Sequence, residues 1–137
     1  MGKSLDSNWG TAMPGTSPRK RAERFEDLDV WQHAHRLVLT VYRITKDYPA
    51  EERFGLVSQM RRAAVSVAAN IAEGFKKRGT RDKTNFYNIA QGSLEELRYY
   101  FILSRDLGYL DGACTVTDEL DVVGKMLYRL VCAIRVP

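Results

Sequence analysis

The amino-acid sequence predicts an all-α fold, an antiparallel up-down-up-down four-helix bundle. Three observations lead to it: apolar residues recur at helical spacing in four consecutive segments, the breaks between these segments are short, and no segment alternates apolar and polar residues as a strand would. The 137 residues, of which 45% are hydrophobic, suffice for one domain with one core. We expect residues 25–137 to form the bundle and residues 1–24 to form a basic, flexible tail.

The first two helices are predicted from apolar stripes with steps of three and four residues. In the first segment, Asp27 or Asp29 can cap the N-terminus, and Pro49 ends the helix. Its stripe consists of Val30, Ala34, Leu37, Val38, Val41, Ile44 and Tyr48. The stripe of the second segment consists of Val57, Met60, Ala64, Val67, Ala68, Ile71 and Phe75. Breaks near residues 48–52 and 77–80 bound the second helix.

The last two helices follow from the same pattern. The third helix is predicted to end near Leu107 and Gly108, and a break near residues 110–114 precedes the fourth, where Thr115 and Asp118 resemble a capping box. The third stripe consists of Phe86, Ala90, Ser93, Leu94, Leu97, Phe101 and Ser104. The fourth stripe consists of Val116, Leu120, Val123, Leu127, Leu130, Val131 and Ile134.

Small residues predict that the second and third helices form the closest pair. They are Ala63, Ala64, Ala68 and Ala69 on the second helix and Ala90 and Gly92 on the third. A glycine inside a helix costs about 1 kcal/mol relative to alanine, and close helix contact is its usual compensation. We therefore expect Gly92 to lie where the two helices approach each other.

The positive charge is concentrated in two segments. The net charge of the chain is +4, with five Lys and Arg against two carboxylates in residues 1–24 and five against one in residues 76–83. The rest of the chain is therefore slightly acidic. Concentrated positive charge attracts polyanions. A solvated basic surface without a partner is the alternative of equal weight.

Residues 76–83 fall at the turn between the second and third helices, so their cations gather at one end of the bundle. This placement predicts a nucleic-acid-binding surface that contacts phosphates without sequence preference. The candidate binding residues are Lys76, Lys77, Arg78, Arg81 and Lys83, together with Arg61. Aromatic residues on the third helix offer base stacking, although core or subunit packing is the favoured interpretation. They are Phe86, Tyr87, Tyr99 and Tyr100.

A polar layer is predicted between the second and third helices. Ser66, Asn70 and Glu73 share one helical face. The hypothesis pairs Arg62 with Glu96 or Glu73, because a buried carboxylate requires a cation or several donors. The predicted network consists of Arg62, Asn70, Glu73, Ser93 and Glu96. A structural role that sets the helix register is favoured over a pair of catalytic carboxylates, because no cleft is indicated.

The sequence does not indicate an enzyme or a cofactor. His33 and His35 diverge on a helix and lack a third ligand, so no metal site is expected. Cys114 and Cys132 lie too far apart along the fourth helix to pair, and core packing is expected for both. Phosphate-binding glycine motifs, catalytic triads and an apolar run of about 18 residues are not found. We expect a reduced, cytoplasmic protein that does not bind membranes.

Apolar residues outside the four stripes predict self-association. A monomeric bundle would expose many of them, and a large exposed apolar patch usually marks a partner surface. They are Leu39, Leu56, Tyr99, Tyr100, Ile102, Val122 and Met126.

Several stretches, taken together, resemble a known family. The opening segment 25–31 reads FEDLDVW, segment 59–67 reads QMRRAAVSV, segment 70–74 reads NIAEG and segment 90–97 reads AQGSLEEL. With FGL at 54–56, these stretches resemble the four-helix bundle proteins encoded in intervening sequences of bacterial 23S ribosomal RNA genes. The resemblance covers about residues 25–132, and the pairing of NIAEG with GSLEEL is its most specific part.

The resemblance implies a small cytoplasmic bundle without known enzymatic activity that forms a homopentameric ring. The fold is also similar to the accessory variability determinant of diversity-generating retroelements, a pentamer that binds nucleic acid and a reverse transcriptase. The expected function is that of a non-enzymatic homo-oligomer, of five subunits by resemblance, that binds RNA or DNA through its basic end. The alternative is a protein-binding scaffold whose basic ends only confer solubility.

Overall fold

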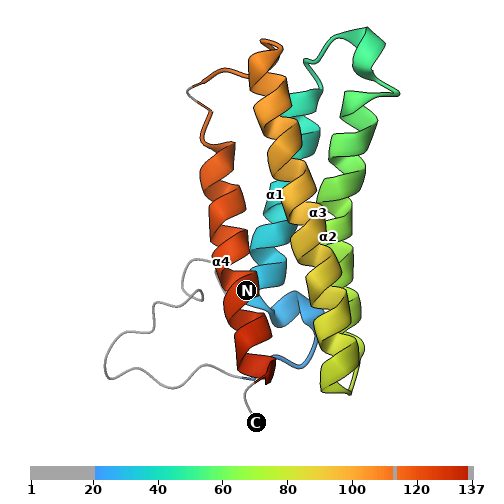
Figure 1. The fold of residues 1–137 in the computed structure, drawn as a ribbon, viewed down its shortest axis with the longest axis vertical. Helices are drawn as coiled ribbons and strands as arrows, with labels where there is room; N and C mark the ends of the chain where they lie inside the picture. The colour runs from blue at the N-terminus through green and yellow to red at the C-terminus, as the bar shows by residue number, and fades with distance from the viewer. Residues whose placement is uncertain (1–20, 113, 136–137) are drawn as a thin grey trace.

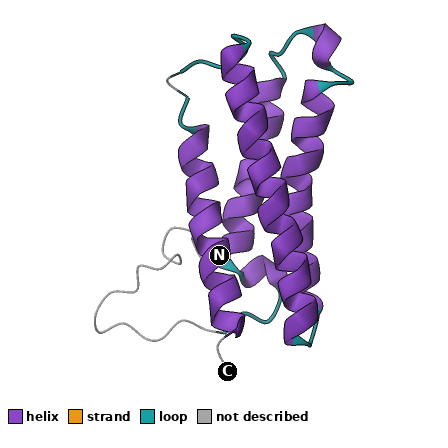
Figure 2. Cartoon of the chain, viewed as in Figure 1, coloured by secondary structure: helices purple, strands orange, loops and turns teal. Residues whose placement is uncertain are grey.

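The structure, a computed structural model, describes residues 21–112 and 114–135. These residues form four α-helices and no strand (Figure 2). The helices are α1 (Asp29–Thr45), α2 (Leu56–Lys76), α3 (Thr80–Asp106) and α4 (Val116–Arg135), and two 3₁₀ turns, η2 (Phe25–Asp27) and η3 (Ala50–Glu52), precede α1 and α2. The predicted all-α class is confirmed. Most of the predicted tail, residues 1–20, lies outside the described residues.

The four helices run side by side as an antiparallel bundle (Figure 1). Both α1 and α3 pack against α2 and α4, so each helix contacts its neighbours around a square. The contact between α2 and α3 is the most extensive in the described chain, which confirms the prediction from the small residues. Only residues 77–79 link these two helices, and so short a link forces them to be antiparallel neighbours.

The core is built largely from the predicted stripes, with corrections at Phe86, Leu56 and Phe75, the last of which is only half-buried and lines a surface groove. Tyr87 is 1% exposed and occupies the core position expected for Phe86, which is only half-buried. Leu56, expected on the surface, is also buried. The largest fully buried side chains are Tyr87, Phe101, Leu37, Met60, Ile71, Leu97, Leu120 and Leu127. Each buried apolar side chain of this size stabilises the fold by roughly 1.5–3 kcal/mol.

The ends of α1 differ from their prediction. Leu28, not an aspartate, occupies the N-cap position, and it provides no side-chain hydrogen bond. The Asp27 carboxylate instead accepts hydrogen bonds from the backbone N–H groups of Glu23 and Arg24, at 3.1 and 3.2 Å. Asp29 is the first helical residue, and its negative charge there interacts favourably with the positive end of the helix dipole.

The helix α1 stops at Thr45, four residues before Pro49. The residue before a proline is sterically biased away from helical geometry. The last turn therefore tightens, and its hydrogen bonds join residues that are three positions apart. These run from Lys46 N to Arg43 O and from Tyr48 N to Thr45 O.

The predicted end of α3 at Leu107 and Gly108 is confirmed, with a clear cause. Gly108 has φ +83°, in the left-handed region that favours glycine. The N–H of Gly108 donates to Arg105 O, and that of Tyr109 donates to Ser104 O at 2.9 Å. This pair of bonds is the Schellman arrangement, which satisfies the last carbonyls of the helix.

The expectation for Gly92 is wrong, and another glycine fills its role. A β-carbon built on Gly92 would meet no atom within 4 Å, so this glycine does not serve the contact between α2 and α3. The close approach occurs at Gly74, where a β-carbon would lie 2.5 Å from Tyr87 Cε1. Gly74 on α2 therefore makes room for the buried ring of Tyr87 on α3.

Candidate nucleic-acid interface and polar network

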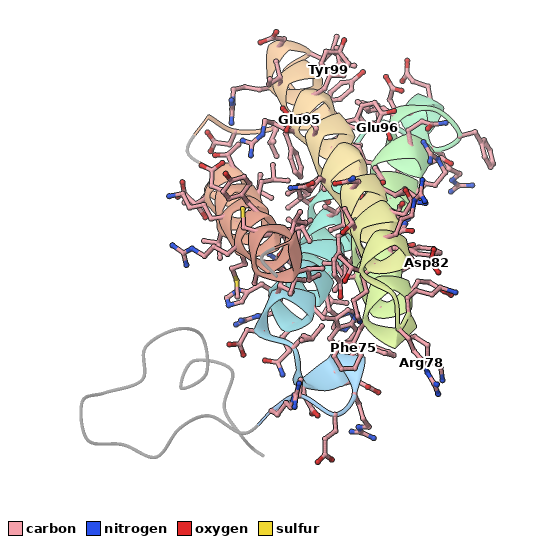
Figure 3. The ribbon with its side chains drawn as sticks, turned by 60° about the horizontal axis from the view of Figure 1, so that its bottom comes forward. Phe75, Arg78, Asp82, Glu95, Glu96 and Tyr99 are labelled. Atoms are coloured by element: carbon pink, nitrogen blue, oxygen red, sulfur yellow. The ribbon has the colours of Figure 1, made fainter. Side chains whose placement is uncertain are left out.

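The turn between α2 and α3 presents three exposed cations. Lys76 ends α2, Arg78 lies in the link, and Arg81 belongs to the first turn of α3. Figure 3 shows Arg78 projecting from this end of the bundle, with Phe75 and Asp82 nearby. Among the described residues, none of the three cations forms an ion pair within 4 Å. Their charges are therefore available to an anionic partner.

Lys83, a fourth candidate, is partly committed to the fold. Its Nζ donates to the carbonyl oxygens of Gly74 and Phe75, at 3.1 and 2.8 Å. The ammonium also lies 5.4 Å from the centre of the Phe75 ring. Burial lowers the pKa of Lys83 from its ordinary value. These contacts satisfy carbonyls at the C-terminus of α2, where the helix dipole favours a cation.

Lys77 is also held against the protein. Its Nζ lies 5.1 Å from the centre of the Phe86 ring, a cation–π contact that joins the link to α3. The side chains of both residues are half-buried. Phe86 therefore supports a lysine at this end and does not fill the core.

A groove with mixed charge adjoins the exposed cations. Residues 23–26 form one wall, and the C-terminal half of α2 forms the other. Its cations are Arg24 and Lys76, and its carboxylates include Glu73 and Glu26. The basic end is therefore interrupted by acidic side chains, which favours a few localised phosphate contacts over a continuous positive surface.

Arg61 does not belong to the basic end. It lies 15 residues from Lys76 along α2, which is about 22 Å of helix. Its Nε donates to Thr45 Oγ1 at 2.9 Å, and its guanidinium lies 4.6 Å from the centre of the Tyr42 ring. Arg61 therefore joins α2 to α1 and serves the fold. Sequence position alone did not show this, because both partners come from another helix.

The first part of the polar network connects Arg62 with Glu96. Arg62 Nη2 donates to Glu96 Oε2 at 3.0 Å and to Gln59 Oε1 at 2.7 Å. The hydroxyl of Tyr100 donates to the same Glu96 oxygen at 2.5 Å, and this hydrogen bond raises the pKa of Tyr100. The Arg62 side chain is 59% exposed, so the pair lies at the edge of the interface between α2 and α3.

The second part of the network is a chain of neutral hydrogen bonds. Ser66 Oγ on α2 and Ser93 Oγ on α3 share a hydrogen bond at 2.8 Å. Asn70 Nδ2 donates to the carbonyl oxygen and the hydroxyl of Ser66, at 2.8 and 3.0 Å. The structure does not bring Glu73 into the network; that carboxylate is exposed and lines the groove beside Phe25. The remaining contacts fix the relative register of two helices.

The aromatic side chains proposed for base stacking are dispersed. Burial raises the pKa of Tyr87 to about 12, and this residue is part of the core. Tyr99 is 56% exposed but lies 18 residues from Arg81, about 27 Å along α3. An aromatic and cationic binding surface of the kind used for single strands is therefore not assembled from these tyrosines.

The two histidines lie on different sides of α1. His35 stacks on Trp31 with ring centres 5.0 Å apart, whereas His33 lines a groove between α1 and α4. Within the described part of the chain, no group of three His, Cys, Asp or Glu residues is placed to hold a metal ion. Cys132 is exposed, contrary to the expected core position, and Cys114 is partly buried against the core. None of the described helices combines the length and apolar character needed to cross a bilayer.

The predicted surplus of exposed apolar residues is found in part. Leu39, Tyr99 and Ile102 are 52%, 56% and 47% exposed. Tyr100, Val122 and Met126 are only half-buried. The sequence analysis missed further exposed apolar side chains, because they lie near the stripes or in links: Tyr42, Phe54, Val65, Ile89, Leu107 and Tyr128.

The fold and the basic end define a class of small antiparallel four-helix bundles with a cationic turn between α2 and α3. Residues 26–129 match the family described as 23S rRNA-intervening sequence protein, and the chain belongs to this family. This confirms the resemblance found in the sequence. No curated protein shows significant sequence similarity to the chain.

A solved structure shares the fold. It is a protein of unknown function from the S23 ribosomal protein family of Bacteroides thetaiotaomicron VPI-5482, with a TM-score of 0.70 and 21% sequence identity. The match covers 75% of this chain and 95% of the other. At this identity, the similarity is evidence for the bundle itself.

Proposed function

We propose that the protein is a non-enzymatic homo-oligomer that binds nucleic acid, foremost RNA, through the end of the bundle at the turn between α2 and α3. The observation that carries this proposal is the group of exposed cations Lys76, Arg78 and Arg81, which have no ion pair in the described chain. Arg24, which lines the same groove as Lys76, extends the surface. Lys77 and Lys83 contribute their charge from positions held by the fold.

Contacts with phosphate account for the expected binding mode. Lysine and arginine side chains at a turn reach the backbone of a nucleic acid, and contacts of this kind position the partner without reading its sequence. Three cations per subunit give weak binding alone. An oligomer that presents several such ends binds with greater avidity, provided that one RNA can span them. The proposed five subunits, the number implied by the family, would multiply the contacts accordingly.

Self-association is supported by the exposed apolar side chains. Phe54 is 88% exposed, and seven other large apolar residues of α1, α2, α3 and α4 are at least 40% exposed. Exposed apolar residues spread over several helices suit an assembly in which one subunit contacts more than one neighbour. Arg62 and Glu96 pair with each other, which supports a structural role for the polar network between α2 and α3. The proposed function therefore includes no catalysis.

Charge reversal tests nucleic-acid binding. The triple variant Arg24→Glu, Lys76→Glu and Arg78→Glu should lose binding to a structured RNA at moderate salt, whereas the wild-type protein should bind. For the wild type, the logarithm of the binding constant should fall with the logarithm of salt concentration with a slope of roughly −2 to −3 per bound subunit end. Fluorescence anisotropy at several salt concentrations measures both quantities, and light scattering checks that the oligomer is intact.

A matched control carries the same change in net charge. Lys46→Glu, Arg53→Glu and Arg105→Glu reverse three exposed cations at the opposite end of the bundle. This control should retain most of the RNA affinity. Equal losses in both triple variants would show that only net charge matters, and unchanged affinity in the first variant would reject the proposed surface.

A protein-binding scaffold is the second candidate function. The specific observation in its favour is Phe54, an almost fully exposed aromatic side chain beside Arg53, whose guanidinium lies 5.9 Å from the ring centre. Aromatic residues and arginine are enriched at the energetic centres of protein interfaces. Absence of salt-dependent RNA binding in the wild type, together with an intact oligomer, would favour this second function.

A further inference from the structure

The outer face of α3 carries an exposed stripe with the spacing of a coiled-coil seam. It begins at Arg81 and ends at Asp106, and its members follow in steps of four, three, four, three, four, three and four residues. All eight residues of the stripe are exposed. Alternating steps of three and four keep side chains on one face of a helix, as in the seam of a coiled coil, although only Tyr99 and Ile102 of these eight residues are apolar. In Figure 1, α3 lies in the foreground, and no described part of the chain covers it.

Gly92 lies near the middle of this stripe and has no role within the subunit. It is exposed in the interior of a 27-residue helix, and a β-carbon there would meet nothing within 4 Å. A helix-destabilising residue in such a place is explained when a second helix approaches the backbone closely. The absence of any close neighbour in the described subunit points to a neighbour outside it.

We propose that the stripe pairs with the same stripe of a second copy, in antiparallel orientation about a two-fold axis. The steps between stripe residues are the same when counted from either end. In one antiparallel register, each stripe residue of one copy therefore faces a stripe residue of the other copy. In that register Gly92 faces Glu95 of the second copy, and Asn88 faces Tyr99. Figure 3 shows Glu95 and Tyr99 on α3. A two-fold contact of one face with itself is the commonest form of self-association.

Charge complementarity supports this register. Arg81 at one end of the stripe faces Asp106 at the other end of the second helix, so the symmetric contact contains this pair twice. Within the described subunit, neither residue has an ion-pair partner within 4 Å. The parallel orientation would instead place Arg81 against Arg81 and Asp106 against Asp106. The antiparallel orientation is therefore the one that the charges favour.

The centre of the contact is compatible with close approach. Glu95, which lies next to the two-fold axis, has Arg98 of its own chain 3.7 Å away, and this cation offsets the repulsion between the two Glu95 side chains. Ile102, 47% exposed, faces Asn85, and Tyr99 faces Asn88, which can accept a hydrogen bond from its hydroxyl. The apolar content is modest, so we expect a dissociation constant of roughly micromolar magnitude.

This inference goes beyond the proposed function, because it does not depend on nucleic-acid binding or on the number of subunits in a ring. In a ring assembly, the contact would join a subunit of one ring to a subunit of another. Without a ring, it would produce a dimer.

A charge swap tests the pairing in the full-length chain. Arg81→Glu and Asp106→Arg should each weaken self-association at least tenfold, because each single variant places two pairs of like charges in contact. The double variant restores opposite charges and should return to within about threefold of the wild type. Sedimentation equilibrium over a range of protein concentrations measures these constants. Circular dichroism confirms that each variant is folded.

Disulfide trapping provides the independent test of register. In a background of Cys114→Ser and Cys132→Ser, the variant Asn88→Cys with Tyr99→Cys should form a covalent dimer on oxidation. The control Ser58→Cys with Glu73→Cys places two exposed thiols on α2, and it should remain largely monomeric on a denaturing gel. Equal trapping in both variants would reject the register.

The two proposals fail separately. Asp106 lies outside the RNA surface, so Asp106→Arg should weaken self-association without changing the intrinsic RNA affinity of a subunit. If the charge swap leaves the mass distribution unchanged and no dimer is trapped, the α3 pairing is rejected and the RNA result stands. If pairing is found but RNA binding is absent, the proposed function is rejected and the α3 pairing stands.

Discussion

Gly74 and Tyr87 are in contact across the two helices that pack most extensively. A β-carbon on Gly74 would lie 2.5 Å from Tyr87 Cε1 and 2.8 Å from Cδ1. Real β-carbons do not approach other atoms this closely, so any residue larger than glycine requires the buried ring or the helix to move. The Lys83 ammonium also binds the carbonyl of Gly74, so the same glycine takes part in two contacts with α3.

Replacement of Gly74 should therefore destabilise the bundle, although alanine is the better helix former. Gly74→Ala should lower the free energy of unfolding by about 1–3 kcal/mol, because overpacking outweighs the gain in helix propensity. Urea denaturation followed by circular dichroism measures the change.

The same substitution at Gly92 provides the matched control. Gly92→Ala lies in open space within the subunit, so at a protein concentration that favours the monomer it should raise stability by up to about 1 kcal/mol. If the two substitutions had the same sign, the close approach at Gly74 would not be the cause.

Tyr87 should make the bundle sensitive to high pH. Its pKa is raised to about 12 in the folded protein, because the buried hydroxyl resists ionisation, whereas the unfolded chain ionises near 10. The folded state therefore retains a proton that the unfolded state loses. The corresponding stability is fully present below pH 10 and is lost as the pH rises towards 12, by about 2–3 kcal/mol in total.

Tyr87→Phe should remove this part of the alkaline loss. Denaturation at pH 7 and at several pH values above 10 compares the slopes of the two proteins. At pH 7 the variant should unfold at nearly the wild-type denaturant concentration, since phenylalanine preserves the ring. A slope identical to that of the wild type would assign the alkaline loss to other groups.

The pair Arg62 and Glu96 should contribute little to stability. Their side chains are 59% and 36% exposed, so solvent screens the attraction, and a double-mutant cycle with Arg62→Ala and Glu96→Ala should give a coupling of about 0.2–1 kcal/mol. Thermal unfolding of the four proteins measures it. A coupling above about 3 kcal/mol would contradict this reading and would indicate a desolvated pair, as in buried networks.

Substitutions of Lys83 and Lys76 should have opposite effects on stability and on RNA affinity. Lys83→Met removes the donor to the carbonyls of Gly74 and Phe75, and should lower stability by about 1 kcal/mol with a small effect on RNA affinity. Lys76→Met should do the opposite, because Lys76 is exposed and forms no ion pair in the described chain. Chemical denaturation and anisotropy titrations measure the two effects, and an identical profile for both variants would contradict this division.

Much of the fold could be predicted from the sequence because its signals are local. The apolar stripes specify four helices, Gly108 ends α3 through its left-handed backbone, and the three-residue link forces α2 and α3 to be antiparallel. The position of residues 76–83 at that link also follows from helix boundaries alone. The local apolar periodicity and the residues that start and stop helices determine such features before any two helices pack together.

Only the tertiary structure decided which side chains meet, because this depends on how each helix is rotated about its axis. That rotation buries Tyr87 and leaves Phe86 at the edge, and it makes Gly74 the residue of close approach while Gly92 faces open space. It also directs Arg61 to Thr45 and leaves Glu73 outside the polar network. Residues one step apart in a helix differ by about 100° in direction, so a stripe read from sequence identifies a face but not its neighbours.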